Sequence, residues 1–407
     1  MKIIGIIAEY NPFHNGHAYQ IEKAREITNA DYVIVIQSGD FTQRGYPAIV
    51  DKFTRAHMAL SSGADMVLEL PLVYATSSAE LFAFGAVSIL QGINIIDTLV
   101  FGSETKNLDT LKDLSLFLCR EPKEYQITLK QGLSMGLSFP VARKKALELT
   151  IPDVSLDKLK ELDKPNNILA LEYLKALYKL NSPIVPCNIQ RQGADYHETS
   201  LNVQNSSATA LRNLIFSSRG IIPDFSKHMP PKSCQILTEA LKQSSPVALD
   251  DFSQAFACQL IRHQKHLNQF LDVDTSLANR IGNSLHDFTT ISGFLDILKH
   301  KSYTHTRISR ALCHILLDIT PQDIPKDCEA ANYAKVLGVK KESRNLLSEL
   351  AQKSSIPVIT NLAKDKDRLS FMGRAMLEKD IQASRLYHLI GNSSLSYNEY
   401  TRPLLIV

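Results

Sequence analysis

Short apolar runs alternate with amphipathic segments through the first half of the chain. Five of these runs have the length of strands buried on both faces of a sheet: 3–8, 31–37, 66–70, 97–101 and 182–189. After the first run, Ala18, Ile21, Ala24 and Ile27 recur at helical spacing. Strands that alternate with helices predict a Rossmann-like, doubly wound parallel α/β sheet.

Helical periodicity fills the intervals and dominates the second half of the chain. Helices are predicted at 51–62, 77–91, 168–180, 232–244, 247–260, 262–272, 275–300, 303–318, 340–352 and 367–387. Residues 106–150 are mostly helical and charged, which is typical of an insertion or lid between sheet segments. Beyond about residue 220 the strand pattern disappears, apart from short strands expected at 357–360 and 403–407, the second pairing with the first.

Composition narrows the class of protein. The 407 residues are 44% hydrophobic and 21% charged, which is typical of a soluble globular protein of two or three domains. The net charge of +3 is too small to identify a polyanionic partner, although it permits a local basic patch. Six scattered cysteines without a C-x-x-C pair favour reduced thiols in the cytoplasm over disulfides or a zinc site. No apolar run has the length of a signal peptide or a membrane span.

The strongest chemical signal directly follows the first strand. His14 and His17 stand three residues apart at the start of a predicted helix, so both imidazoles lie on one face. A helix N-terminus attracts phosphate, and Gly16 lets a ligand approach the backbone. Imidazole N–H groups can stabilise charge on a transferring phosphoryl group. A metal-binding pair or two surface histidines are the alternative, which the strand–turn–helix context disfavours.

Other candidate residues follow the remaining strands, at the edge where open α/β sheets bind ligands. In the loop after the second strand, Arg44 could pair with a phosphate or carboxylate, and Asp40 could orient it or a metal. A simple solvated loop is an equally good interpretation. Gly102 could let the backbone approach adenine or ribose, and Arg191 stands where an anion would sit.

Two further helix starts carry polar residues. Ser206 or Ser207 can cap one helix, so that its first N–H groups point at one spot, and Arg212 can reach the same anion one turn later. A capped surface helix with a solvated arginine is the alternative. Asn166 and Asn167 precede another helix, where they could be N-caps or ligand contacts.

Residues 299–310 form a basic segment that contains no acid. It includes Lys301, Tyr303, Arg307 and Arg310. Phosphate neutralisation dominates nucleic-acid affinity, and an aromatic side chain among basic residues can stack on a base. A solvated helix junction with Tyr303 in the core explains the segment equally well.

These motifs together resemble a known family. His14-Asn15-Gly16-His17 is similar to the H-x-G-H signature of the nucleotidyltransferase superfamily, and 206–212 is similar to its serine–arginine signature. The longer stretch 5–17, the loop 38–45 and the segment 303–310 resemble the tRNA(Met) cytidine acetate ligase family. The resemblance extends over nearly the whole chain, least in 106–150 and 220–280.

The resemblance implies a site for ATP, with Mg²⁺ on its phosphates and no metal-ligating residue from the protein. His14, His17, Ser207 and Arg212 would be the catalytic residues that hold the triphosphate. The expected ATP contacts are Ile7, Ala8, Glu9, Tyr10, Asn11, Pro12, Phe13, His14, Asn15, Gly16, His17, Gln20, Gly102, Asn167 (preferred over Asn166), Arg191, Ser207 and Arg212. The expected contacts to the other substrates are Asp40, Arg44, Lys301, Tyr303, Arg307 and Arg310.

The activity that the resemblance implies is ATP-dependent ligation of acetate to tRNA. Acetate would form acetyl-adenylate, which would acetylate the wobble cytidine of elongator tRNA(Met) to N4-acetylcytidine. Residues 1–220 would be the nucleotidyltransferase-like catalytic domain and 221–407 the tRNA-binding region, with no membrane or protein partner implied. The alternatives are a small-molecule adenylyltransferase, disfavoured by the long basic C-terminal region, and a non-catalytic ATP-dependent RNA-binding protein, disfavoured by the intact signatures.

Overall fold

The sheet brings together strands that are far apart in the sequence. The computed structural model describes residues 1–151, 164–191, 207–218, 220–325, 332–392 and 395–407. Five parallel strands stand in the order β5-β4-β1-β2-β3. They are β1 (Ile3–Ala8), β2 (Tyr32–Ser38), β3 (Met66–Leu70), β4 (Thr98–Ser103) and β5 (Val185–Gln190). The predicted parallel α/β sheet and its five strands are confirmed.

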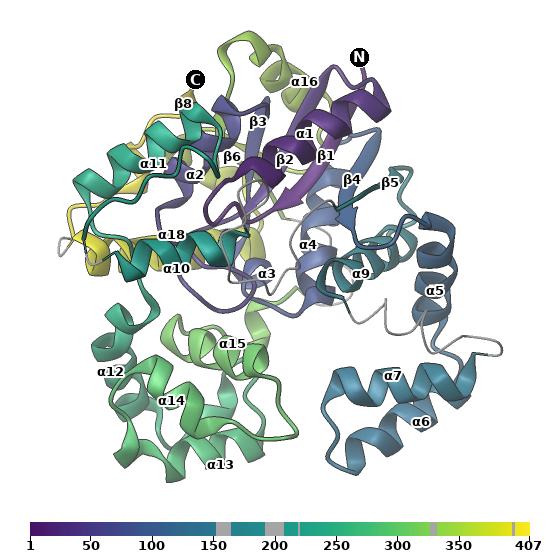
Figure 1. The fold of residues 1–407 in the computed structure, drawn as a ribbon, viewed down its shortest axis with the longest axis vertical. Helices are drawn as coiled ribbons and strands as arrows, with labels where there is room; N and C mark the ends of the chain where they lie inside the picture. Colours follow the sequence, from purple (N-terminus) through teal and green to yellow (C-terminus); the bar gives the residue numbers. More distant parts are fainter. Residues whose placement is uncertain (152–163, 192–206, 219, 326–331, 393–394) are drawn as a thin grey trace.

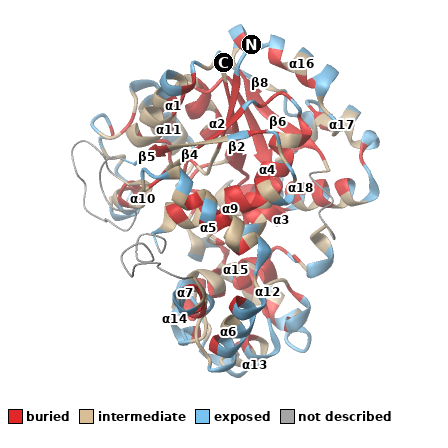
Figure 2. Cartoon of the chain, turned by 90° about the vertical axis from the view of Figure 1, so that its right-hand side faces the viewer, coloured by how far each residue is buried: buried red, intermediate tan, exposed pale blue. Residues whose placement is uncertain are grey.

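Alternate residues of the central strands face two hydrophobic cores, one on each side of the sheet. The helices that supply these cores include α1 (Asn15–Thr28), α2 (Lys52–Ser61), α4 (Ala79–Gly92), α9 (Pro165–Lys179) and α11 (Pro231–Gln243). Ile4 and Val33 pack in one core with side chains of α1, α2 and α11. Ile3 and Ile34 pack in the other core with α4 and α9. Each such buried side chain stabilises the fold by about 1.5–3 kcal/mol. Helices thus cover both faces of the buried sheet (Figure 1 and Figure 2).

The C-terminal half of the chain also contributes to the sheet, and β6 is the strand of this half that the sequence pattern did not indicate. β6 (Ala334–Val339) runs antiparallel to β3, while β7 (Val358–Ile359) and β8 (Leu405–Ile406) both pair with β6. The two short strands were therefore predicted correctly, but their predicted pairing with each other was wrong. The division of the chain into a catalytic and a tRNA-binding part stays a prediction.

A buried lysine explains why β6 was missed. Lys335 interrupts the apolar run 333–339, and it is only 3% exposed. Its ammonium group lies 2.6 Å from Glu69 Oε2 and also pairs with Glu399. Lys52 is buried in the same cluster and pairs with the same two carboxylates. A lysine in a sequence normally indicates an exposed position, so the buried strand cannot be recognised until the carboxylates that pair with Lys335 are known.

Two helical lobes lie below the carboxyl edge of the parallel strands in the view of Figure 1. One lobe holds α6 (Lys123–Ser134) and α7 (Phe139–Thr150), connected through α5 (Leu108–Arg120). The other lobe holds α12 (Ser253–His263), α13 (Thr275–Asn283), α14 (Ile291–Leu298) and α15 (His305–Leu316). The Ser302 hydroxyl donates a hydrogen bond of 3.1 Å to the Gly136 carbonyl, which links the lobes.

The helices of the second half differ in detail from their predicted ranges. The range 275–300 holds two helices, α13 and α14, because Thr290 caps a new helix through the Gly293 N–H. The range 262–272 holds only the end of α12 and a short 3₁₀ turn. The remaining helices are α3 (Leu72–Ala75), α10 (Ala208–Ser217), α16 (Asn345–Lys353), α17 (Leu362–Asp365) and α18 (Phe371–Asn392). None of the described helices is long and apolar enough to cross a membrane.

Candidate active site

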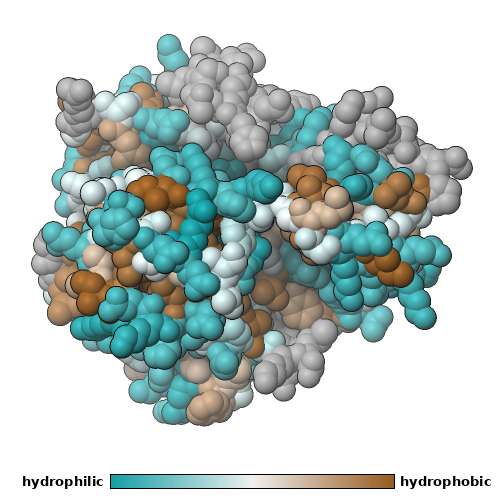
Figure 3. Space-filling model, turned by 90° about the horizontal axis from the view of Figure 1, so that it is seen from below, coloured by the Kyte–Doolittle hydropathy of each residue, from teal (hydrophilic) through white to brown (hydrophobic). Residues whose placement is uncertain are grey.

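A cavity of about 410 Å³ opens at the carboxyl edge of the parallel strands. Its walls come from the ends of β1 and β4, from the N-termini of α1 and α10, and from the loops that contain residues 42–49 and 247–249. Seen from below, the face that carries the two lobes is largely polar, with scattered apolar patches (Figure 3). The cavity therefore lies where the parallel sheet was expected to bind its ligand.

His14 and His17 form a stacked pair at the start of α1. His14 is the N-cap: its Nδ1 accepts from the Gly16 N–H at 3.1 Å, while the His14 N–H donates to His17 Nδ1 at 3.2 Å. The two ring centres are 3.7 Å apart. Because each Nδ1 is an acceptor, the proton of each neutral ring is on Nε2. Both side chains line the cavity, so they can offer Nε2–H donors to it.

Burial keeps both imidazoles neutral. Burial, reinforced by the positive charges of Arg191 and Arg212, lowers the pKa of His14 to about 3. Burial also holds the pKa of His17 well below its ordinary value, with His14 and Arg191 as smaller causes. At neutral pH the pair therefore acts through neutral N–H donors and leaves the cationic role to the arginines.

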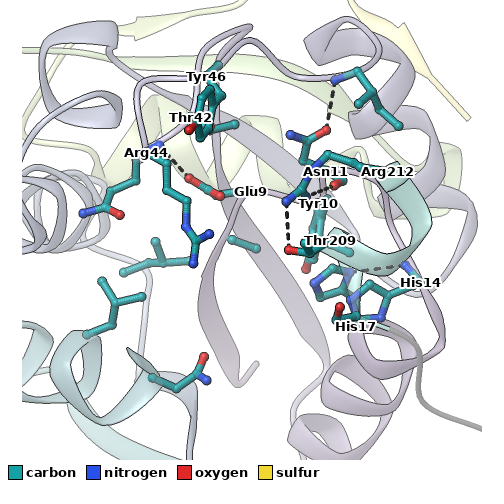
Figure 4. A pocket seen from close by; sticks show the side chains of 18 of the residues that line it. Glu9, Tyr10, Asn11, His14, His17, Thr42, Arg44, Tyr46, Thr209 and Arg212 are labelled. Carbon is teal, nitrogen blue, oxygen red and sulfur yellow. Dashed lines mark hydrogen bonds between the residues drawn. The ribbon is translucent and has the colours of Figure 1, made fainter. Parts of the chain in front are cut away.

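The two signature segments of the sequence meet at this cavity. Arg212 Nη1 donates 2.7 Å to the Asn11 carbonyl, and Arg212 Nη2 donates 2.9 Å to the Thr209 hydroxyl. The Ser207 side chain caps α10 by accepting from the Ala210 N–H at 3.1 Å. The N-termini of α1 and α10 thus converge beside the histidine pair (Figure 4). Ser206, the other candidate cap, lies outside the described residues.

Tyr10 has two unusual properties for a residue of this site. Its backbone φ of 50° is in the left-handed region, which a bulky residue rarely adopts. Its ring contacts the His17 ring edge-to-face, with centres 4.8 Å apart. Tyr10 lines the cavity, and its buried hydroxyl has no hydrogen-bond partner among the described residues. A buried donor of this kind is costly unless a ligand satisfies it.

Most of the predicted ATP contacts lie in the cavity wall. The wall contains Ile7, Ala8, Glu9, Tyr10, Asn11, His14, His17, Gln20, Arg44, Gly102, Arg191, Ser207 and Arg212. The predicted residues outside it are Pro12, Phe13, Asn15, Gly16, Asp40, Asn167, Lys301, Tyr303, Arg307 and Arg310. Gly16 nevertheless holds His14 through its N–H, and Phe13 packs on Tyr10 with ring centres 4.8 Å apart.

The N-cap alternative for the two asparagines is wrong, whereas an ATP contact stays a prediction. α9 begins at Pro165 with Lys164 as its N-cap, so neither asparagine caps the helix. The Asn167 side chain is buried and accepts the Glu104 N–H at 2.9 Å. Asn166 lines the cavity and accepts from Arg191 at 3.3 Å. The geometry favours Asn166 over Asn167 as the ligand contact.

Asp40 accepts hydrogen bonds that hold its loop against α2 and α18. Its carboxylate accepts from the Lys52 N–H and from the Ser384 hydroxyl, each at 2.7 Å. The side chain is buried outside the cavity wall, which favours a structural role over substrate contact. Arg44, from the same loop, does line the cavity.

The basic segment is largely ion-paired with acids that sequence reasoning did not connect to it. Arg307 lies 2.8 Å from Asp274, which also accepts from the Tyr303 hydroxyl at 2.8 Å. Arg310 lies 3.0 Å from Asp272. Lys301 is exposed. The sequence shows Asp272 and Asp274 just before α13, but only the fold brings them to α15.

This segment contacts the loop that carries Arg44. At Gly45, φ is +75°, and a Cβ there would come within 2.7 Å of the Ser309 carbonyl oxygen. Glycine is therefore needed for the loop to approach α15. The contact places the basic segment beside one wall of the cavity.

Sequence reasoning missed several residues of the wall. They include Thr42, Gln43, Tyr46, Phe82, Phe101, Tyr173, Thr209, Phe216 and 247–249. Thr209 stands inside the serine–arginine signature and could have been included. The apolar residues carry no chemical signal of their own, and 247–249 reach the cavity only through tertiary folding.

A parallel α/β sheet with a cavity at its carboxyl edge, between the N-termini of α1 and α10, is the arrangement of a nucleotidyltransferase, and the comparison with known proteins agrees. A family model described as "HIGH Nucleotidyl Transferase" matches residues 1–402, so the chain belongs to that family.

Curated relatives define the family more narrowly. The chain is 40% identical over 411 residues to the "tRNA(Met) cytidine acetate ligase" of Thermoanaerobacter sp. (strain X514), with all of both chains covered. It is 39% identical over 407 residues to the protein of the same name from Caldanaerobacter subterraneus subsp. tengcongensis, again with full coverage. The chain belongs to the tRNA(Met) cytidine acetate ligase family and is an ATP-dependent ligase. The family predicted from the sequence is confirmed.

Solved structures show the same fold. Thermotoga maritima TmcAL in its apo form I is 31% identical to the chain, with full coverage of both and a TM-score of 0.93. The same protein bound with alpha-thio ATP gives a TM-score of 0.92, also at 31% identity and full coverage.

Proposed function

We propose that the chain activates acetate with ATP and transfers the acetyl group to the wobble cytidine of elongator tRNA(Met), which gives N4-acetylcytidine. The observation that carries the proposal is the meeting of the His14–His17 segment with the Ser207–Arg212 segment at one cavity. The names of the full-length relatives support the choice of acetate and tRNA(Met).

In the first step, an acetate oxygen attacks the α-phosphorus of ATP, and pyrophosphate leaves as acetyl-adenylate forms. The Nε2–H groups of His14 and His17, the cap region at Ser207 and the Arg212 guanidinium would hold the β- and γ-phosphates. They would stabilise the charge that develops on pyrophosphate, since positioning and electrostatics dominate such transfers. Arg191 would add a further positive charge beside them.

The nucleoside would lie toward β4. Gly102 lines the cavity near the end of this strand, and a Cβ there would lie 3.3 Å from Arg191 Cγ, so a side chain at this position would crowd Arg191. Asn166 stands beside Arg191 and could read the adenine edge. Arg44, which lines the cavity from the 42–46 loop, would suit the acetate carboxylate because guanidinium binds carboxylates well.

Mg²⁺ would accompany the ATP phosphates. Among the described residues, no cluster of three or more His, Cys, Asp or Glu could hold a metal ion. Mg²⁺ keeps several waters and uses substrate phosphates as ligands, so ATP itself would supply ligands to the ion. When bound, the ion would neutralise part of the triphosphate charge.

The basic segment around Lys301 and α15 would contact the tRNA backbone. Its contact with the 42–46 loop at Gly45 supports this proposal, because that loop forms one wall of the cavity that the cytidine would enter. Asp272 and Asp274 offset part of the positive charge of Arg310 and Arg307, so the exposed Lys301 would add to the attraction to phosphate.

Pyrophosphate release separates this proposal from its alternatives. The chain should release pyrophosphate from ATP with acetate and then acetylate tRNA(Met). Release only with a nucleotide cosubstrate would instead indicate a small-molecule adenylyltransferase. No release under either condition would indicate a non-catalytic RNA-binding protein.

A further inference from the structure

Glu9 does not fit a site that only binds a triphosphate. Among the described residues that line the cavity, it is the single carboxylate, and it shares that wall with His14, His17 and the arginines at 44, 191 and 212. A fixed negative charge beside ATP phosphates opposes their binding. Its presence therefore points to a task for a different substrate.

The structure holds this carboxylate in one place. Glu9 Oε1 accepts the Gln43 N–H at 2.7 Å. The Glu9 carbonyl accepts from Arg55 Nη1 at 2.6 Å, and this buried arginine also donates to the Gly39 carbonyl. Backbone and side chain are thus fixed between the Thr42–Tyr46 loop and the Asn11–Arg212 contact, as Figure 4 shows.

We propose that Glu9 binds the exocyclic N4 amine of the target cytidine and accepts its proton when the acetyl group is transferred. This inference rests on the proposed function. Carboxylates accept hydrogen bonds from the cytosine N4 amine, so the same contact would select cytosine. Glu9 stands between the phosphate-binding walls and the loop beside the basic segment, where a base carried by tRNA would meet acetyl-adenylate.

The transfer step is balanced without another reactant. The N4 nitrogen forms a bond to the acetyl carbonyl carbon, and the bond from that carbon to the phosphate oxygen breaks. AMP leaves with the electron pair, and Glu9 takes the proton that N4 loses. The Glu9 carboxyl group then returns the proton to water.

Hydroxylamine separates the two half-reactions in the test. It attacks acetyl-adenylate without help from a base, so acetohydroxamate reports activation, whereas N4-acetylcytidine reports transfer to tRNA. Glu9→Gln keeps the oxygen that accepts the Gln43 N–H but cannot take a proton. We expect the ratio of tRNA acetylation to acetohydroxamate formation to fall by about 10²-fold or more in Glu9→Gln, with partial recovery in Glu9→Asp.

Glu104→Gln is the matched control. Glu104 accepts from the Asn166 and Asn167 N–H groups on the nucleoside side, outside the cavity wall. Glu104→Gln should raise the KM for ATP and so slow acetohydroxamate formation and tRNA acetylation equally. The ratio of the two rates should stay unchanged.

An equal loss of both reactions in Glu9→Gln would overturn the inference. If added Mg²⁺ then restored both, Glu9 would be a ligand of the nucleotide's metal. If the unmodified chain formed no acetohydroxamate from acetate, the proposed function itself would fail, and the inference with it.

Discussion

At the scale of single residues, Tyr10 combines a strained backbone with a buried hydroxyl that has no partner among the described residues. Its left-handed backbone and its buried, unpartnered hydroxyl both cost stability, and its ring braces His17. Strain of this kind persists where the surrounding structure enforces it. Under the proposed function, we infer that a phosphate oxygen of bound ATP satisfies the hydroxyl, since Tyr10 lines the cavity.

Tyr10→Phe should weaken ATP binding without weakening the fold. The ring stays on His17, while one hydrogen bond to a charged group, about 1.5–3 kcal/mol, is lost. The dissociation constant for a non-hydrolysable ATP analogue should rise about tenfold or more by titration calorimetry. Tyr74→Phe is the control, since Tyr74 also has a buried unpartnered hydroxyl but lies outside this cavity. Equal affinities for both variants would contradict this role of Tyr10.

The neutral histidine pair predicts a dependence of stability on pH. Unfolded, His14 takes up a proton below its ordinary pKa of 6.5, whereas in the fold burial lowers its pKa to about 3. The unfolded state therefore binds more protons, and the free energy of unfolding falls as the pH drops from about 6.5 toward 3. The free energy of unfolding should fall from pH 7 to pH 5 in both proteins. In His14→Asn this fall should be smaller by about 2 kcal/mol than in the unmodified chain. Urea unfolding at the two pH values measures this, and parallel losses would refute it.

At the scale of elements, strands and helix starts could be predicted because their signals are local. β1 and its helix combine an apolar run, a turn and a capping residue within 3–17. β6 could not be predicted, because the burial of Lys335 depends on Glu69 and Glu399, each far away in the sequence. The same limit applies to Asn166 and Asn167, whose roles depend on whether α9 begins before or after them.

The buried charge cluster gives a test at this scale. Lys335→Met leaves Glu69 and Glu399 with only Lys52, and breaking a buried ion pair costs about 3–5 kcal/mol. Adding Glu399→Gln rebalances the charge and should recover part of the loss in urea unfolding. Lys353→Met, which breaks the exposed pair with Glu349, should cost about 1 kcal/mol or less. A similar cost for Lys335→Met would mean that the cluster does not hold the β6 edge.

At the scale of the whole molecule, the sheet places one reaction site above two helical lobes. The sequence predicted the catalytic edge and the basic segment separately, because each has its own pattern. Their contact at Gly45, and the acids Asp272 and Asp274 that neutralise the arginines, arise only from the fold.

Binding of tRNA should involve the face that carries α15. Arg307→Ala with Arg310→Ala should weaken tRNA binding and flatten its dependence on salt, by about 0.9 in log–log slope per lost phosphate contact. Asp274→Asn is the control: it frees Arg307 from its acid and should bind tRNA at least as tightly. An unchanged salt slope in the arginine variant would mean that Arg307 and Arg310 contact no phosphate of the tRNA.

The exchange of labelled pyrophosphate into ATP most directly tests whether the two signature segments hold one nucleotide. The unmodified chain should exchange pyrophosphate only when acetate is present. His17→Ala and Arg212→Ala should each abolish the exchange while tRNA binding persists. Exchange that needs no acetate, or that survives the loss of either side chain, would contradict a single site built from both segments.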